Sequence, residues 1–178
     1  MRLLTATVLA LLAASSCWAT REDLQKIAPE KINSWSAVKD ATVYGRGDGI
    51  TDIYNGGYEV YTKAGVTEAL RRIYEQKGKY VEVTAHQMKS ASAARAFLAD
   101  RYRMETGKSA PKAQSVLRFS SSGSGSSTAY AVQGRWFFTA VVFEETAQGR
   151  AQAEGFVKVL EQKSAALDKS RQKQGGKG

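Results

Sequence analysis

Residues 66–88 read VTEALRRIYEQKGKYVEVTAHQM, and this stretch decides the predicted fold. Its second half alternates between two sets of side chains, with Val81, Val83 and Ala85 on one side and Glu82, Thr84 and His86 on the other. A period of two is typical of an antiparallel strand that has one buried and one solvent-facing side. Residues 68–72 are good helix formers, yet the chain passes through a glycine-containing turn at 76–79 directly into this strand. We therefore predict a β-hairpin in which His86 faces solvent.

The sequence before the hairpin predicts two helices and a strand. We expect a short helix over 24–32, a short strand over 41–44, and a helix over 50–64 that Gly65 ends. The last of these follows from apolar and aromatic residues at helical spacing.

The sequence after the hairpin predicts a helix, three strands and a final helix. Ser90 or Ser92 caps the first helix, which ends near Gly107. Strands follow over 116–120, 130–133 and 136–144, and an amphipathic helix runs to Leu167. Residues 137–143 are nearly all apolar, which favours a central strand covered on both faces, whereas the serine-rich run 120–127 favours a polar loop or hairpin connection. The whole order predicts an α+β fold, an antiparallel sheet of about five or six strands with two or three helices packed on it.

The two ends of the chain differ in character from the middle. Residues 1–19 combine a basic start, an apolar run and a small-residue stretch, which is the pattern of a secretory signal peptide. The run is shorter than the roughly 20 residues that a spanning helix needs, so we expect no transmembrane helix. Cleavage after Ala19 predicts a periplasmic or extracellular protein, and the alternative, cleavage before Cys17, predicts a lipoprotein anchored through that cysteine. We expect a single α+β domain over 20–167 and a disordered basic tail over 168–178, which has no apolar side chain to bury.

Composition excludes several classes of function. With 43% hydrophobic residues, 24% charged residues and two prolines, the chain is typical of a globular protein. One cysteine and one histidine are too few for a structural zinc site, a haem attachment, an iron–sulfur cluster or a disulfide framework, so we expect no metal and no cofactor. The formal net charge is +9, but from residue 163 onward five basic residues stand against one acidic residue. We therefore expect no nucleic-acid partner, and only a weak contact of the basic tail with an anionic surface.

The candidate functional segment is DIYNGGYEVY at 52–61. Each glycine inside a helix costs up to about 1 kcal/mol relative to alanine, so Gly56 and Gly57 need a compensating role. One interpretation is packing, because a helix without Cβ atoms at these positions lies close to the sheet. The other is a ligand site, because four oxygen-bearing side chains would share one face of a continuous helix, namely Asp48, Asp52, Asn55 and Glu59. A plain solvated helix face explains the same pattern. The candidate ligand-binding residues are Asp52, Asn55, Gly56, Gly57, Tyr58 and Glu59.

Residues 53–61 also carry a resemblance. Together with a strand pair that ends at Met88 and a helix start rich in serine and alanine, they resemble a family of exported bacterial proteins known only as a domain of unknown function. The core of that family is a tyrosine followed by Ile-Asn-Gly-Gly-Ala-Glu and a further aromatic residue. Here Tyr54 replaces the isoleucine and Tyr58 replaces the alanine. The similarity extends over 35–167, and its specific part is 55–57 with Glu59. It implies export and the hairpin, and it implies no reaction.

These observations predict an exported, non-enzymatic binding or envelope-associated module whose ligand is an envelope polymer or a glycan. The alternative is a hydrolase of an envelope polymer that uses Glu59 with Asp52 or Glu144 as an acid–base pair. That alternative requires the carboxylates to converge in a cleft, and a Glu59 that points into bulk water excludes it. A serine-protease-like triad built on His86 and a phosphate-binding loop over 45–49 both lack the accompanying motifs.

Overall fold

The structure is a computed structural model that describes residues 20–54, 56–111 and 118–175. The predicted signal peptide, Asn55 and the start of the strand expected over 116–120 lie outside these ranges. The described elements in chain order are α1 (Arg21–Ile27), β1 (Lys31–Ile32), β2 (Trp35–Arg46), the 3-10 helix η1 (Gly47–Asp52), α2 (Tyr58–Ala64), β3 (Val66–Gln76), β4 (Lys79–Met88), α3 (Ala91–Thr106), β5 (Arg118–Gly123), β6 (Ser126–Gln133), β7 (Trp136–Val142) and α4 (Ala147–Gly175).

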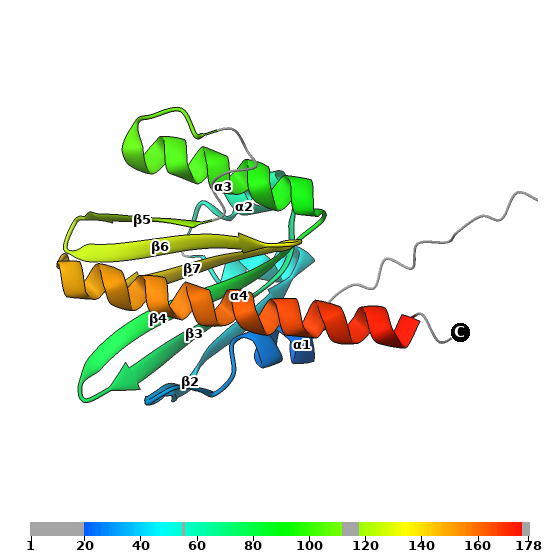
Figure 1. Cartoon of the computed structure of the whole chain (residues 1–178), viewed down its shortest axis with the longest axis horizontal. Helices are drawn as coiled ribbons and strands as arrows, with labels where there is room; N and C mark the ends of the chain where they lie inside the picture. Colours follow the sequence, from blue (N-terminus) through cyan, green and yellow to red (C-terminus); the bar gives the residue numbers. More distant parts are fainter. Residues whose placement is uncertain (1–19, 55, 112–117, 176–178) are drawn as a thin grey trace, which may run out of the picture.

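The seven strands of the described residues form one twisted antiparallel sheet in the order β1-β2-β3-β4-β7-β6-β5 (Figure 1). The predicted α+β class is confirmed. The described part of the chain exceeds the expected number of elements, with seven strands, four α-helices and one 3-10 helix. The predicted β3–β4 hairpin is also confirmed, and its turn consists of Lys77 and Gly78, both at positive φ. Positive φ at both turn residues matches the right-handed twist of the flanking strands.

Helices cover both faces of this sheet and bury a core on each. Along β6, Ala129 and Ala131 belong to the core beneath α1 and α4, whereas Tyr130 and Val132 belong to the core beneath η1, α2 and α3. Alternate residues of a strand point to opposite faces, so α4 and α3 lie on opposite sides of the sheet. β7 lies inside the sheet between β4 and β6 and contributes to both cores, which confirms the predicted central strand as far as Val142. Phe143 follows the strand and is 60% exposed, contrary to the prediction.

Two regions form more strand than the sequence predicted. The short strand expected over 41–44 is part of the longer β2, whose earlier residues pair with β1 and β3. The serine-rich run is a hairpin rather than a long loop, because β5 and β6 pair up to a turn at Ser124 and Gly125. Small polar residues have weak strand preference on their own, so the pairing with β7 and the cover of α4 determine this conformation.

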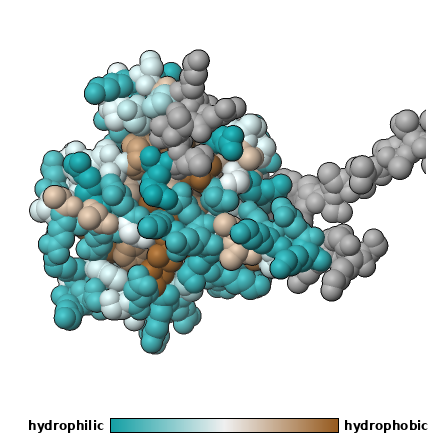
Figure 2. Space-filling view, in the orientation of Figure 1, coloured by the Kyte–Doolittle hydropathy of each residue, from teal (hydrophilic) through white to brown (hydrophobic). Residues whose placement is uncertain are grey.

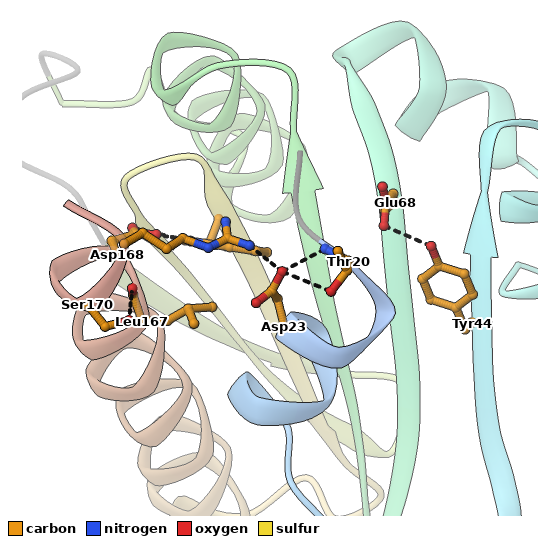
Figure 3. A network of polar contacts seen from close by, with 9 residues as sticks. Thr20, Asp23, Tyr44, Glu68, Leu167, Asp168 and Ser170 are labelled. Atoms are coloured by element: carbon orange, nitrogen blue, oxygen red, sulfur yellow. Dashed lines mark hydrogen bonds and ion pairs between the residues drawn. The ribbon is translucent and has the colours of Figure 1, made fainter. Parts of the chain in front are cut away.

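The tail expected to be disordered from residue 168 is helical up to Gly175, as the C-terminal part of α4. Two contacts hold it against the domain. The Trp136 Nε1–H donates to the Asp168 carboxylate at 3.2 Å, and Arg171 forms an ion pair with Asp23 of α1. Figure 3 shows Asp23 facing α4 while its carboxylate also accepts the Thr20 N–H. The C-terminal part of α4 has no apolar side chain to bury, so these polar tertiary contacts stabilise it as a helix.

The face on which α4 lies is mainly hydrophilic, with small hydrophobic areas between the polar side chains (Figure 2). Across the residues that the structure describes, no helix has the length and apolar character needed to cross a membrane.

Candidate functional site

The prediction of one continuous helix over 50–64 is wrong. The chain forms η1, leaves the helical conformation and begins a separate helix, α2, at Tyr58. Gly56 and Gly57 have φ values of 89° and 69°, a left-handed backbone that glycine adopts without steric cost. Both are exposed, and a Cβ on either would meet no atom within 4 Å. The packing interpretation of this pair is therefore overturned. The two glycines are required by the turn between the helices.

The glycine that is closely packed is Gly45, near the end of β2. A Cβ at this position would lie 2.2 Å from the carbonyl oxygen of Gly49 and 2.8 Å from the Cα of Ile50. No real side chain tolerates such distances to backbone atoms, so η1 folds back over β2 at a separation that only glycine permits. The fold-back buries Ile50 completely. It also places η1 beside α2 and the beginning of β3.

The predicted carboxylate face does not form. Asp48 and Asp52 lie on η1 and Glu59 lies on α2, and all three are exposed. Within the described ranges, no group of three acidic, histidine or cysteine side chains is placed to hold a metal ion. Asn55 lies outside the described residues.

The acid–base pair that the hydrolase alternative needs is not brought together either. Glu59 is exposed on α2, and Glu144 forms an ion pair with Lys79 at 2.9 Å. Glu144 follows the end of β7, whereas α2 leads into β3 at the end of the sheet where β7 begins. The length of β7 separates them, about 20 Å at the rise of a strand, which exceeds the spacing of a glycosidase pair. Asp52, the other predicted partner of Glu59, is exposed as Glu59 is, and neither lines the cavity described next, so we do not pursue the hydrolase alternative.

A cavity of about 460 Å³ opens between the end of β2, η1, α2 and the beginning of β3. Its apolar floor comes from Ile50 and Val66, and its polar groups come from Arg46, Asp48, Tyr58, Thr62 and Thr67. Of the predicted site residues, Tyr58 lines this cavity, whereas Asp52, Gly56, Gly57 and Glu59 do not. The lining combines one aromatic ring, three hydroxyls and one charge of each sign. Such a surface suits a polar ligand that has several hydrogen-bonding groups.

Arg46 links the cavity to a buried carboxylate. Its Nε lies 3.4 Å from Oε1 of Glu68, whose other oxygen accepts the Tyr44 hydroxyl at 2.8 Å (Figure 3). Burial and the Glu68 carboxylate raise the pKa of Tyr44 to about 12, so the tyrosine remains a donor. Glu68 is 1% exposed, and its charge attracts the guanidinium of Arg46 at the cavity wall. The sequence did not single out this trio, because its members are close only through the pairing of β2 with β3.

An aromatic cluster anchors the segment between η1 and α2 to the sheet. The Tyr54 hydroxyl donates to Nε2 of His86, and the Tyr54 ring stacks on Tyr61 of α2 with centroids 3.7 Å apart. The guanidinium carbon of Arg101, on α3, lies 5.0 Å from the ring centroid of Tyr61. These contacts fix α2, which has no fully buried residue of its own, and they thereby position Tyr58 at the cavity.

His86 is fully buried, so the prediction that it faces solvent is wrong. Helices α2 and α3 cover this face of β4, as the core they share with the sheet shows. The Nδ1 of His86 donates to the carbonyl oxygen of Phe137 at 2.9 Å, which leaves Nε2 unprotonated to accept the Tyr54 hydroxyl. Burial lowers the pKa of His86 to about 4, and burial raises the pKa of Tyr54. The pair is thus neutral around pH 7.

Comparisons with known proteins give little beyond a distant structural likeness. Searches against protein-family models and against curated proteins found no match. Among solved structures, the extracellular domain of PknH from Mycobacterium tuberculosis is similar, with a TM-score of 0.45 and 17% identity. The match covers 81% of this chain and 92% of that one.

Proposed function

We propose that the protein is an exported, non-enzymatic binding module that holds a glycan or a segment of an envelope polymer in the cavity beside Tyr58. Export is inferred from the signal-peptide pattern of residues 1–19, and the resemblance to a family of exported proteins agrees with it. Periplasmic, extracellular and lipid-anchored forms are all compatible with this proposal.

The observation that carries the proposal is the lining of the cavity. A glycan presents apolar C–H faces and many hydroxyls, and the cavity offers the ring of Tyr58 together with the hydroxyls of Thr62 and Thr67. Arg46 and Asp48 add a donor and an acceptor at the rim. Its volume of about 460 Å³ lies within the range of small-molecule sites. The aromatic cluster fixes α2 and so positions Tyr58 before a ligand arrives, and the Glu68 carboxylate attracts Arg46 toward the cavity wall.

The experiment is a thermal-unfolding screen of the purified protein against saccharides, peptidoglycan fragments and teichoic-acid or lipopolysaccharide fragments. A ligand present at 100 times its dissociation constant stabilises the folded state by about 2.7 kcal/mol, a shift that is readily measured. When a ligand stabilises the protein, NMR chemical-shift mapping of the protein with that ligand should then show changes at Tyr58, Thr62 and Thr67.

Substitution of Tyr58 separates this site from a general surface effect. Tyr58→Ala should abolish the response, because it removes the aromatic wall of the cavity. The matched control is Tyr80→Ala, since Tyr80 is 47% exposed near the tip of the β3–β4 hairpin and does not line this cavity. A screen without any glycan or polymer hit, or a hit that Tyr58→Ala leaves intact, would refute the proposal.

A further inference from the structure

A second cavity forms where β2 separates from β3. The register between these strands shifts between Ala37, which pairs with Tyr74, and Thr42, which pairs with Arg72. An advance of five residues along β2 therefore corresponds to an advance of two residues along β3. The extra residues of β2 form an irregular bulge that includes Asp40, which has a φ of 61°. A bulge disrupts the ladder and redirects side chains, and such irregularities are frequent beside functional sites. Here it opens a cavity of about 390 Å³.

Arg72 lines this cavity although it is only 4% exposed. Its Nε donates to the Thr42 hydroxyl at 2.9 Å, and its Nη1 donates to the carbonyl oxygen of Ala28 at 2.6 Å. Both acceptors are neutral. Among the described residues, no carboxylate lies within 4 Å of its guanidinium. Arginine stays protonated in proteins, so β3 carries a buried positive charge without an ion-pair partner.

The side chains around Arg72 do not supply the missing negative charge. Glu30 and Asp40 line the same cavity, but both are exposed and neither is paired with Arg72. Lys31 and Lys39 also line it, so the cationic groups outnumber the acidic ones. A buried charge is costly unless it is compensated, and a guanidinium binds phosphate and carboxylate groups through paired N–H donors.

We propose that this bulge cavity is an anion-binding site in which Arg72 binds a phosphate or carboxylate group and Lys31 and Lys39 attract it from the rim. The site is separate from the cavity beside Tyr58. The two cavities have no lining residue in common, so each can be tested while the other is intact.

The test follows the arginine Nε–H resonances of the ¹⁵N-labelled protein during titration with sodium phosphate and, in a second arm, sodium acetate, against sodium chloride at equal ionic strength. We expect the Arg72 resonance to shift saturably with at least one of the two anions, with a dissociation constant of about 1 mM or tighter. The two arms distinguish a phosphate ligand from a carboxylate ligand. Arg72→Met identifies the resonance and should abolish the response.

Variants at the rim keep the proposal testable if Arg72→Met does not fold. Lys31→Met should weaken anion binding about 2- to 5-fold, as expected for the loss of an exposed charge. Glu30→Gln should strengthen binding by removing a repulsive charge. Arg103→Met, at an exposed arginine on α3 that pairs with Asp100, is the control and should change nothing. An Arg72 resonance that neither anion moves, or rim substitutions without effect on binding, would show that Arg72 has a purely structural role and overturn the proposal.

Discussion

Acidification should destabilise the protein through His86. Its pKa is about 4 in the folded state, compared with 6.5 for an ordinary histidine, because burial disfavours the charged ring. Between pH 4 and pH 6.5, the unfolded chain therefore binds a proton on this histidine, whereas the folded chain does not. Stability that is present above pH 6.5 is lost as the pH falls, at about 1.4 kcal/mol per unit, and the loss is complete below pH 4. Protonation of His86 should therefore lower the free energy of unfolding by about 3 kcal/mol in total.

Urea unfolding at a series of pH values between 7.5 and 4 measures this loss, and the variant His86→Gln isolates the histidine from the carboxylates. Glutamine stays neutral and offers one donor and one acceptor, as the histidine does toward Phe137 and Tyr54. The difference in unfolding free energy between the wild-type protein and the variant should fall by about 3 kcal/mol across this range.

A direct titration checks the same reasoning. His86 is the only histidine in the chain, so its ring protons give one set of NMR signals in the tag-free protein. The surrounding groups are the aromatic rings of Tyr54, Tyr61 and Phe137, with Arg101 as the nearby charge. Burial, reinforced by the positive charge of Arg101, lowers the pKa of His86, and the hydrogen bond to the Phe137 carbonyl only partly opposes this. A measured pKa near 6.5, or parallel pH profiles for the wild-type protein and His86→Gln, would refute the burial that we assign to this ring.

Three further substitutions, measured by urea or thermal unfolding, test the architecture of the site and the docking of α4. Gly45→Ala should lower the unfolding free energy by about 3 kcal/mol, because its Cβ would collide with the backbone of Gly49, and a near-neutral result would contradict the fold-back of η1. Gly57→Ala should lower it by only about 1 kcal/mol, the cost of a left-handed backbone in open space, so an effect as large as that of Gly45→Ala would restore the packing interpretation. Asp168→Ala should cost about 1–3 kcal/mol because the buried Trp136 Nε1–H loses its acceptor, and tryptophan fluorescence should report the change; unchanged stability and fluorescence would mean that the end of α4 does not dock as described.

Much of the candidate site could not be predicted from the sequence, and the helix expected over 50–64 shows why. The apolar spacing there is helical, but periodicity carries no information on φ, and the left-handed conformations of Gly56 and Gly57 interrupt the helix. Tyr58 was a candidate and does line the cavity, whereas Arg46, Thr62 and Thr67 were not singled out. The one available signal was the glycine-rich run 45–49, which indicates that the chain turns sharply beside β2.

The sequence alone determined the local pattern: the alternation of β4, the cap of α3 by Ser90, its end at Gly107, and the apolar β7 that lies between the two cores. These features depend on the periodicity of apolar side chains and on short-range backbone preferences, both of which neighbouring residues determine. Only the tertiary structure decided that His86 is buried, that α4 continues to Gly175, and that the bulge of β2 leaves Arg72 beside a cavity. Each of these depends on groups that are far apart in the chain and meet only when the helices pack on the sheet, so no local window of sequence contains the determining contact.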